Sequence, residues 1–175
     1  MFTVSQCPLP QDTLLYRYES GPGLHTDCFE TEVAKGVSLP DYIEAFFNSP
    51  ILRIERKLLG LALPKSNYDD VVSLAQGQSD HLSGWRTEDR TDQEILLTVM
   101  GGGVRTWLKV IPEKDHSRLL FGSAVVPPDD GPVDDTGAPK MAWWVTALMG
   151  FHKLYSHIVL GAAKWQLKRM QPAQA

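Results

Sequence analysis

The strongest hydrophobic pattern of the chain lies near its C-terminus. Apolar residues recur there at alternating intervals of four and three, which is the spacing of one face of an α-helix. The stripe consists of Trp144, Leu148, Phe151, Tyr155, Ile158, Ala162 and Trp165. We therefore predict an amphipathic helix from about Lys140 to Arg169, whose apolar face lies across a sheet or, in part, against another chain. No other segment predicts a helix of equal length.

Two short helices joined by a proline are predicted between residues 39 and 61. Ser38 is a suitable N-cap, and Asp41 follows three residues later, as in a capping box. Pro50 favours the start of a second helix, because proline suits the first helical position. The two apolar stripes are Leu39, Ile43, Phe46 and Phe47, and then Ile51, Ile54, Leu58 and Leu61. A third helical segment is predicted from about residue 67 to 75, closed by Gly77.

After Gly77 the hydrophobic period changes to about two, which indicates strands. The predicted strands are Ser83–Arg90, Glu94–Val99, Val104–Ile111 and Arg118–Val126, preceded by an earlier strand from Leu24 to Ala34. The joins between the later strands have hairpin length, so we expect an antiparallel meander. Residues 1–23 are interpreted as an irregular lead-in with a short strand at Leu14–Tyr18, and residues 24–170 as one domain. Residues 127–139 are predicted to form a linker.

Charged residues alternate with apolar ones on the strand Ser83–Arg90. Strict alternation places Arg86, Glu88 and Arg90 on one face, and Trp85, Thr87 and Asp89 on the other. If the first face points inward, Arg86 and Glu88 form a buried ion pair that could fix an anionic headgroup. If it points outward, these are surface charges. The outward orientation is favoured, because an unpaired buried charge is costly.

Composition narrows the function classes. The net charge of -4 and the pI of about 5.7 argue against nucleic acid as the main partner. No apolar run is long enough to span a membrane, and no secretory signal is recognised, so a cytoplasmic protein is expected. Cys7 and Cys28 match no metal-binding spacing, although a disulfide between them stays open. No metal and no cofactor are expected.

The order of elements and two stretches of sequence resemble a known superfamily. The stretches are GWRTEDRTDQEILLTVMGGGVRTWLKVIPEKDHSRLLFGSAVVP and FHKLYSHIVLGAAKW. They are similar to the START-like (SRPBCC) superfamily, and most of all to a bacterial family of unknown function within it. The resemblance implies an α+β helix-grip fold: a curved antiparallel sheet wrapped around a long C-terminal helix, with two short helices after the first strand. That fold commonly encloses an apolar cavity. Superfamily members include lipid and hydrophobic-ligand carriers, aromatase/cyclases and ring-hydroxylating oxygenase subunits, but the iron-binding motif of the last group does not occur here.

The favoured hypothesis is a protein that binds a small hydrophobic molecule between the sheet and the C-terminal helix. The expected ligand-binding residues are Trp85, Arg86, Trp107, Phe121, Leu148, His152 and Tyr155. A protein-interaction module that forms a homodimer is the alternative, and it predicts a filled core with Trp143, Trp165 or part of the long helix exposed. A cyclase or hydratase would require at least two polar side chains that converge inside. No hydrolase signature and no catalytic residue is identified.

Overall fold

The computed structural model describes residues 4–21, 24–59, 66–99, 103–126 and 143–170, without the side chains of residues 55–59 and 143–154. In chain order the elements are β1 (Ser5–Gln6), the 3-10 helix η1 (Leu14–Tyr18), β2 (His25–Ala34), α1 (Leu39–Phe47), α2 (Pro50–Leu59), α3 (Tyr68–Ala75), β3 (His81–Leu82), β4 (Trp85–Arg90), β5 (Glu94–Val99), β6 (Val104–Pro112), β7 (His116–Val125) and α4 (Trp143–Met170). The predicted linker at residues 127–139, and residues 100–102 of the predicted join between two later strands, lie outside the described residues.

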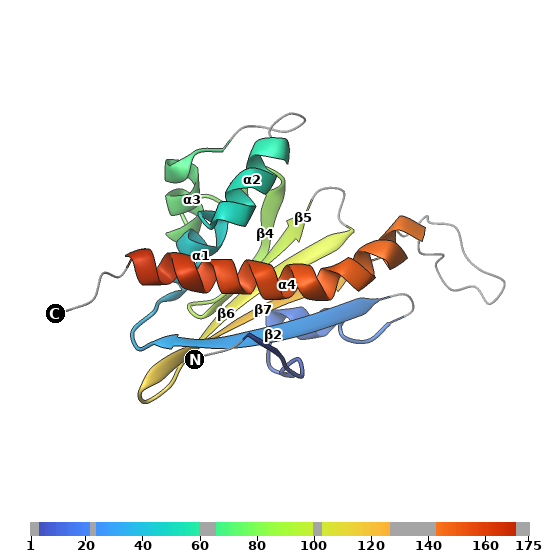
Figure 1. Cartoon of the computed structure of the whole chain (residues 1–175), viewed down its shortest axis with the longest axis horizontal. Helices are drawn as coiled ribbons and strands as arrows, with labels where there is room; N and C mark the ends of the chain where they lie inside the picture. The colour runs from blue at the N-terminus through green and yellow to red at the C-terminus, as the bar shows by residue number, and fades with distance from the viewer. Residues whose placement is uncertain (1–3, 22–23, 60–65, 100–102, 127–142, 171–175) are drawn as a thin grey trace.

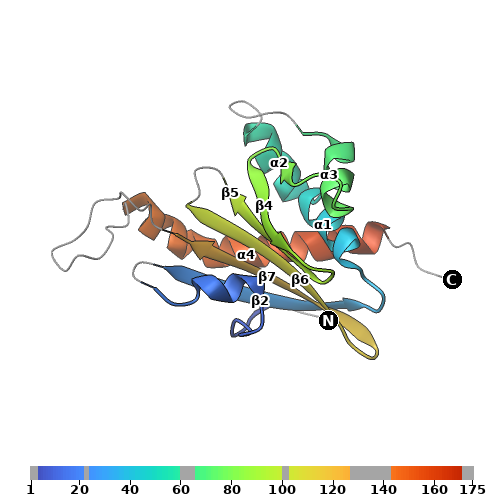
Figure 2. The same ribbon diagram turned by 180° about the vertical axis from the view of Figure 1, so that it is seen from behind.

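The strands form one antiparallel sheet in the order β1-β2-β7-β6-β5-β4-β3. The four α-helices cover one face of this curved sheet, with α4 lying across it (Figure 1). Viewed from behind, η1 lies against the opposite face (Figure 2). We call these the helix-side face and the outer face. The predicted α+β class and the antiparallel meander of β4 to β7 are confirmed.

Each face has its own hydrophobic core. The larger core lies between the helix-side face and α1 to α4, and many of its side chains are completely buried. The smaller one, the outer core, consists of Leu15, Cys28, Leu96, Trp107, Leu120 and Ala124. Leu15 comes from η1, so the N-terminal lead-in contributes to the outer core. Within the described residues, none of the helices combines the length and apolar character needed to cross a membrane.

Local capping signals were sufficient to place the short helices. Ser38 and Asp41 form a reciprocal capping box at the start of α1, as predicted, and Asn67 and Asp70 form another at the start of α3. Gly77, which follows α3, has a φ of 72°, a conformation that glycine adopts without steric cost. These signals depend only on residues three or four positions apart, which explains why the sequence alone revealed them.

The lead-in differs from its prediction. Leu14–Tyr18 forms a 3-10 helix and not a strand, because this turn buries Leu15 in the outer core while Arg17 and Tyr18 reach charged groups on β4. The strands β1 and β3 were not predicted. Each has only two residues, which is too short for a hydrophobic period to be recognised.

A β-bulge in β4 overturns part of the predicted strand alternation. Thr87 pairs with Leu97, whereas Asp89 already pairs with Leu96, so Glu88 is an extra residue in the ladder. The insertion reverses the alternation for the rest of the strand. Asp89 therefore lies on the outer face beside Arg17, and Arg90 lies on the helix side. There the Arg90 guanidinium donates hydrogen bonds to the Leu74 and Ala75 carbonyl oxygens at the end of α3.

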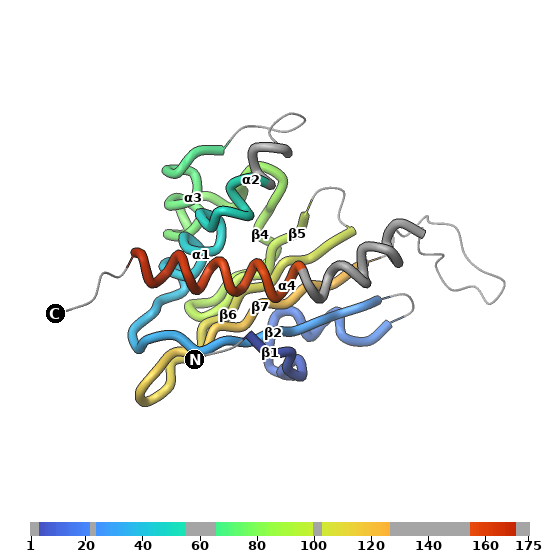
Figure 3. Tube along the Cα trace, viewed as in Figure 1, coloured from blue at the N-terminus to red at the C-terminus, as the bar shows by residue number. Residues whose placement is uncertain are grey.

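The predicted apolar stripe of α4 does not coincide with its buried face. In the half of α4 whose side chains are described (coloured in Figure 3), the buried residues are Ser156, Val159, Leu160, Ala163, Lys164 and Leu167. Ile158 and Trp165 from the predicted stripe are 43% and 48% exposed. A strict seven-residue repeat drifts by about 20° per heptad around a straight helix. A seven-residue spacing therefore does not keep Ile158 and Trp165 on the buried face of α4.

Candidate functional site

An aromatic cluster covers part of the helix-side face. The Phe46 ring of α1 stacks on Phe121 of β7, with 5.5 Å between ring centroids. Phe47 contacts Trp85 of β4 edge to face at 5.3 Å. Tyr155 of α4 packs against the same core. Three of the predicted ligand-binding residues, Trp85, Phe121 and Tyr155, therefore contribute to one continuous apolar core.

A row of polar side chains runs across three adjacent strands beside this cluster. The row consists of Asp27 on β2, Ser123 on β7 and Thr106 on β6, which are paired in register and are all nearly buried. Asp27 Oδ1 accepts hydrogen bonds from the Ser123 hydroxyl at 2.8 Å and from the Ser123 backbone N–H at 3.1 Å. We refer to these three residues as the polar row.

An apolar row lies directly next to the polar row. It consists of Phe29, Phe121 and Leu108, which occupy the same three strands two positions further along. Because side chains two positions apart on a strand point to the same face, both rows face the helices. All three apolar side chains belong to the larger core. The helix-side face thus places a buried carboxylate and two hydroxyl groups beside a mainly aromatic surface.

A lysine on α4 adds a further polar contact. Lys164 Nζ donates a hydrogen bond to Thr31 Oγ1 at 2.9 Å, and both residues are buried. Thr31 lies on β2, two residues beyond Phe29, so the apolar row has polar groups on both sides at β2. Burial, followed by repulsion from Lys168, lowers the pKa of Lys164. The contact fixes the C-terminal half of α4 against β2.

At the corner between α1 and α2, some buried polar atoms have no hydrogen-bond partner among the described residues. These atoms are Asn48 Nδ2 and Ser49 Oγ, and the Ser83 hydroxyl of the β3–β4 turn is a third. Ser83 also has a φ of 53°, which is uncommon for a residue other than glycine. The contact between Phe47 and Trp85 brings these two segments to the same end of the aromatic cluster. Buried donors and hydroxyl groups without a partner are costly, so this corner lowers the stability of the fold.

Two other predicted site residues, Arg86 and Trp107, do not join this cluster. Arg86 is exposed and pairs with Thr98 on the outer face, so it forms no buried ion pair on the helix side. Trp107 is completely buried in the outer core, on the other side of the sheet from Trp85 and Phe121. Leu148 and His152 belong to the part of α4 whose side chains lie outside the described residues.

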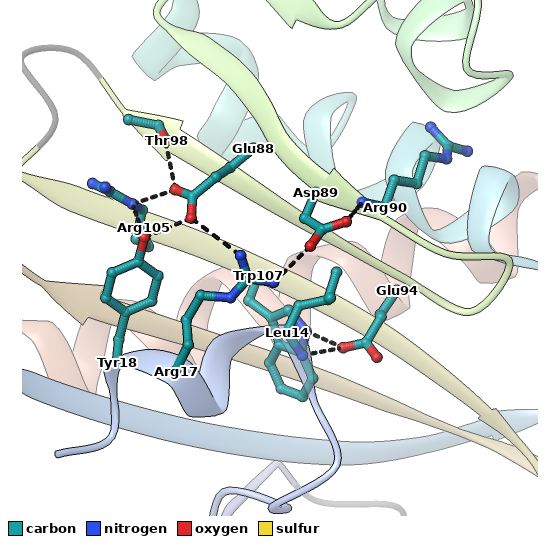
Figure 4. Close-up of polar contacts among 10 residues, drawn as sticks. All are labelled: Leu14, Arg17, Tyr18, Glu88, Asp89, Arg90, Glu94, Thr98, Arg105 and Trp107. Carbon is teal, nitrogen blue, oxygen red and sulfur yellow. Dashed lines mark hydrogen bonds and ion pairs between the residues drawn. The ribbon is translucent and has the colours of Figure 1, made fainter.

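The outer face carries a separate polar network (Figure 4). Glu94 Oε2 accepts hydrogen bonds from the Trp107 indole N–H at 2.7 Å and from the Leu14 backbone N–H at 3.0 Å. Lys109 Nζ lies 3.3 Å from Glu94 Oε1. These contacts attach the first residue of η1 to β5 and β6.

A second part of this network joins η1 to β4. Glu88 accepts hydrogen bonds from Tyr18 at 2.5 Å, Thr98 at 2.9 Å and Arg105 at 2.6 Å. Burial and the hydrogen bond to Glu88 raise the pKa of Tyr18. Arg17 pairs with Asp89 at 2.6 Å. Each of these acidic groups has a basic or hydroxyl partner, so the network is best explained as the attachment of the lead-in to the sheet.

The polar row was missed in the sequence, although a signal for it existed. Asp27 is an even number of positions from Phe29 and Val33 on its strand, so its side chain points to the same face as theirs. The same relation holds between Ser123 and Phe121, and between Thr106 and Leu108. A polar residue at a position whose strand neighbours are core residues is a candidate for a buried functional group. The register that places the three residues side by side is a tertiary feature, so their association was not predictable.

Comparison of the chain with protein-family models, curated proteins and solved structures found no match. The START-like resemblance therefore remains a prediction. Among the described residues, no three His, Cys, Asp or Glu side chains are grouped so that they could hold a metal ion.

Proposed function

We propose that this chain binds a small, largely apolar molecule that carries a hydroxyl or amine group, between the helix-side face of the sheet and α4. One observation carries the proposal: the apolar row of Phe29, Phe121 and Leu108 lies beside the polar row of Asp27, Ser123 and Thr106. Small-molecule sites are mostly apolar and contain a few polar groups that fix the orientation of the ligand. The resemblance to START-like carriers agrees with this role.

The polar row selects the chemistry of the ligand. A carboxylate only accepts hydrogen bonds, so Asp27 favours a hydroxyl or amine donor over an anionic headgroup. Arg86, which could have bound an anion, is exposed on the outer face. The ligand body would lie against Phe121 and the aromatic cluster, with its donor group at Asp27. We propose a cytoplasmic location for this activity, in agreement with the sequence.

The first experiment is native mass spectrometry of the freshly purified full chain, followed by extraction and identification of any bound compound. Saturable binding of that compound, or of a panel of long-chain alcohols and amines, is then measured by titration. Asp27→Asn should weaken binding by roughly 10–100-fold, because hydrogen bonds to charged groups contribute about 1.5–3 kcal/mol. Phe121→Leu should weaken it as well, since the ligand loses aromatic contact area.

Glu30→Gln is the matched control. Glu30 is a carboxylate on the same strand, but its side chain points to the opposite face of the sheet and pairs with Arg118 at 3.3 Å. This variant should bind as the wild type does. If Asp27→Asn and Glu30→Gln bind equally well, the polar row is not the binding site. If the wild type carries no compound and binds none of the panel, the proposed function is wrong.

A specific observation favours a second candidate function, the formation of a homodimer through α4. Ile158 and Trp165 are exposed seven residues apart on this helix, and Ala162 lies between them. A seven-residue apolar repeat is the pattern by which two long helices pack together. The chain predicts no second helix of this length, so a second copy of α4 is the partner we propose. Sedimentation equilibrium should then show a dimer that Trp165→Glu converts to a monomer; a wild-type monomer at all concentrations would exclude it.

A further inference from the structure

The two cysteines of the chain lie directly opposite each other on adjacent strands. β1 pairs with β2 in a register that matches Ser5 with Glu30 and Gln6 with Phe29. Continued by one residue, this register places Cys7 opposite Cys28, and the Cys7 backbone N–H donates a hydrogen bond to the Cys28 carbonyl oxygen at 2.9 Å. A hydrogen bond joins the two sulfur atoms across 3.1 Å, and both cysteines are free thiols.

The two thiols have different environments. Cys28 is 2% exposed and belongs to the outer core, whereas Cys7 is half-buried at its margin. The hydrogen bond between the thiols lowers the pKa of Cys7, since it stabilises the Cys7 thiolate. The same hydrogen bond, together with burial, raises the pKa of Cys28. Because the thiolate is the reactive form of cysteine, Cys7 is the group that reacts first with a reagent from solvent.

We propose that Cys7 and Cys28 form a reversible redox pair, which closes to a disulfide on reaction with a low-molecular-weight disulfide such as oxidised glutathione. The Cys7 thiolate attacks one sulfur of the reagent, forms a mixed disulfide and releases one glutathione thiolate. The Cys28 sulfur then attacks Cys7 Sγ, forms the Cys7–Cys28 bond and releases the second glutathione. The two cysteines lose two electrons, the reagent gains them, and the two thiol protons pass to the released glutathione molecules.

The disulfide would fix the N-terminal lead-in to the sheet. The segment that it closes contains η1, which is attached to the sheet by Leu15 in the outer core and by the ion pair of Arg17 with Asp89. A covalent link at Cys7 limits the opening of this segment and the exposure of Trp107 beneath it. The pair lies on the outer face, opposite the proposed ligand site, so the proposal does not depend on the proposed function.

The test compares the full chain in reduced and in oxidised glutathione. Intact mass should fall by two hydrogens in the oxidised sample, and proteolysis without reductant should yield a peptide pair joined through Cys7 and Cys28. The midpoint of thermal unfolding should rise by roughly 6–12 °C on oxidation, as expected for a loop of this length in a chain of this size. Hydrogen exchange of the η1 amides should become slower. Dithiothreitol should reverse all of these changes.

Cys7→Ser is the control variant, because Cys7 is only half-buried and its replacement leaves the outer core intact. Oxidised glutathione should neither lower its mass by two hydrogens nor raise its unfolding midpoint. The proposal is overturned if the wild type keeps both thiols free, or if it accumulates a stable mixed disulfide with glutathione in place of the internal bond. It is also overturned if the unfolding midpoint of the oxidised wild type equals that of the reduced protein.

Discussion

Replacing Glu94 tests whether the outer-face network holds the lead-in to the sheet. Its carboxylate accepts hydrogen bonds from Trp107 and Leu14 and pairs with Lys109, which is itself nearly buried. In Glu94→Ala, the indole N–H of Trp107 and the backbone N–H of Leu14 lose their acceptor. The Lys109 ammonium also loses its carboxylate partner.

The expected loss of stability is large for a single substitution. Breaking a buried ion pair by removing one partner costs about 3–5 kcal/mol, and we expect Glu94→Ala to fall in this range. That loss corresponds to a decrease of roughly 10 °C in the unfolding midpoint. Glu94→Gln keeps an oxygen acceptor for Trp107 and Leu14 but removes the charge that pairs with Lys109. We expect it to cost about 1–3 kcal/mol.

Urea unfolding followed by tryptophan fluorescence measures these losses. Glu32→Ala is the control, since Glu32 lies on the same sheet but is half-exposed. Its nearest basic atom, His116 Nε2, is 3.8 Å away, and this long, exposed contact should contribute about 0–1 kcal/mol. Hydrogen exchange should also become faster in η1 for Glu94→Ala and remain unchanged for Glu32→Ala. If the two alanine variants differ by less than about 1 kcal/mol, the outer-face network does not contribute as argued.

Two further predictions concern positions on either side of the sheet. In Gly122→Ala, the added Cβ would lie 2.6 Å from Leu15 Cδ2 and 2.9 Å from the Asp27 carbonyl oxygen. Because the backbone carbonyl cannot easily move away, the free energy of unfolding of this variant in urea should fall by about 1–3 kcal/mol. An unchanged midpoint would contradict the close packing of β2, β7 and η1. Tyr42 is completely buried and donates a hydrogen bond to the Leu120 carbonyl oxygen, and burial raises its pKa well above the usual value. The pKa of Tyr42 is raised only in the folded state, so above about pH 10 the tyrosine ionises in the unfolded chain before it ionises in the fold. The contribution of Tyr42 to the free energy of unfolding is therefore complete below about pH 10 and decreases at higher pH. Tyr42→Phe should therefore lose less stability than the wild type between pH 9 and pH 11, and equal losses would refute this assignment.

The candidate site was only partly visible in the sequence. Trp85, Phe121 and Tyr155 were predicted as ligand-binding residues, and the structure places all three in or against one apolar core. Large aromatic residues at regular strand and helix positions are usually buried. Trp107 has the same aromatic character, but it lies on the other face, where η1 covers it. No local sequence pattern predicts that the lead-in segment contributes to a second core on the outer face.

The sequence by itself determined the features that depend on neighbouring residues. Ser38 with Asp41 and the proline at position 50 fixed the short helices, and the period-two segments with short joins fixed the antiparallel meander. Each of these signals acts over a few residues, so an isolated segment already contains it.

Only the tertiary structure decided which side chains meet. The bulge at Glu88 reverses the side-chain alternation of β4 and directs Arg90 to α3. Packing against α1 and β2 selects the buried face of α4. The polar row exists because Asp27 and Ser123, 96 residues apart, pair in register. Such contacts are chosen by the packing of the whole core, in which each side chain fits only with the others in place.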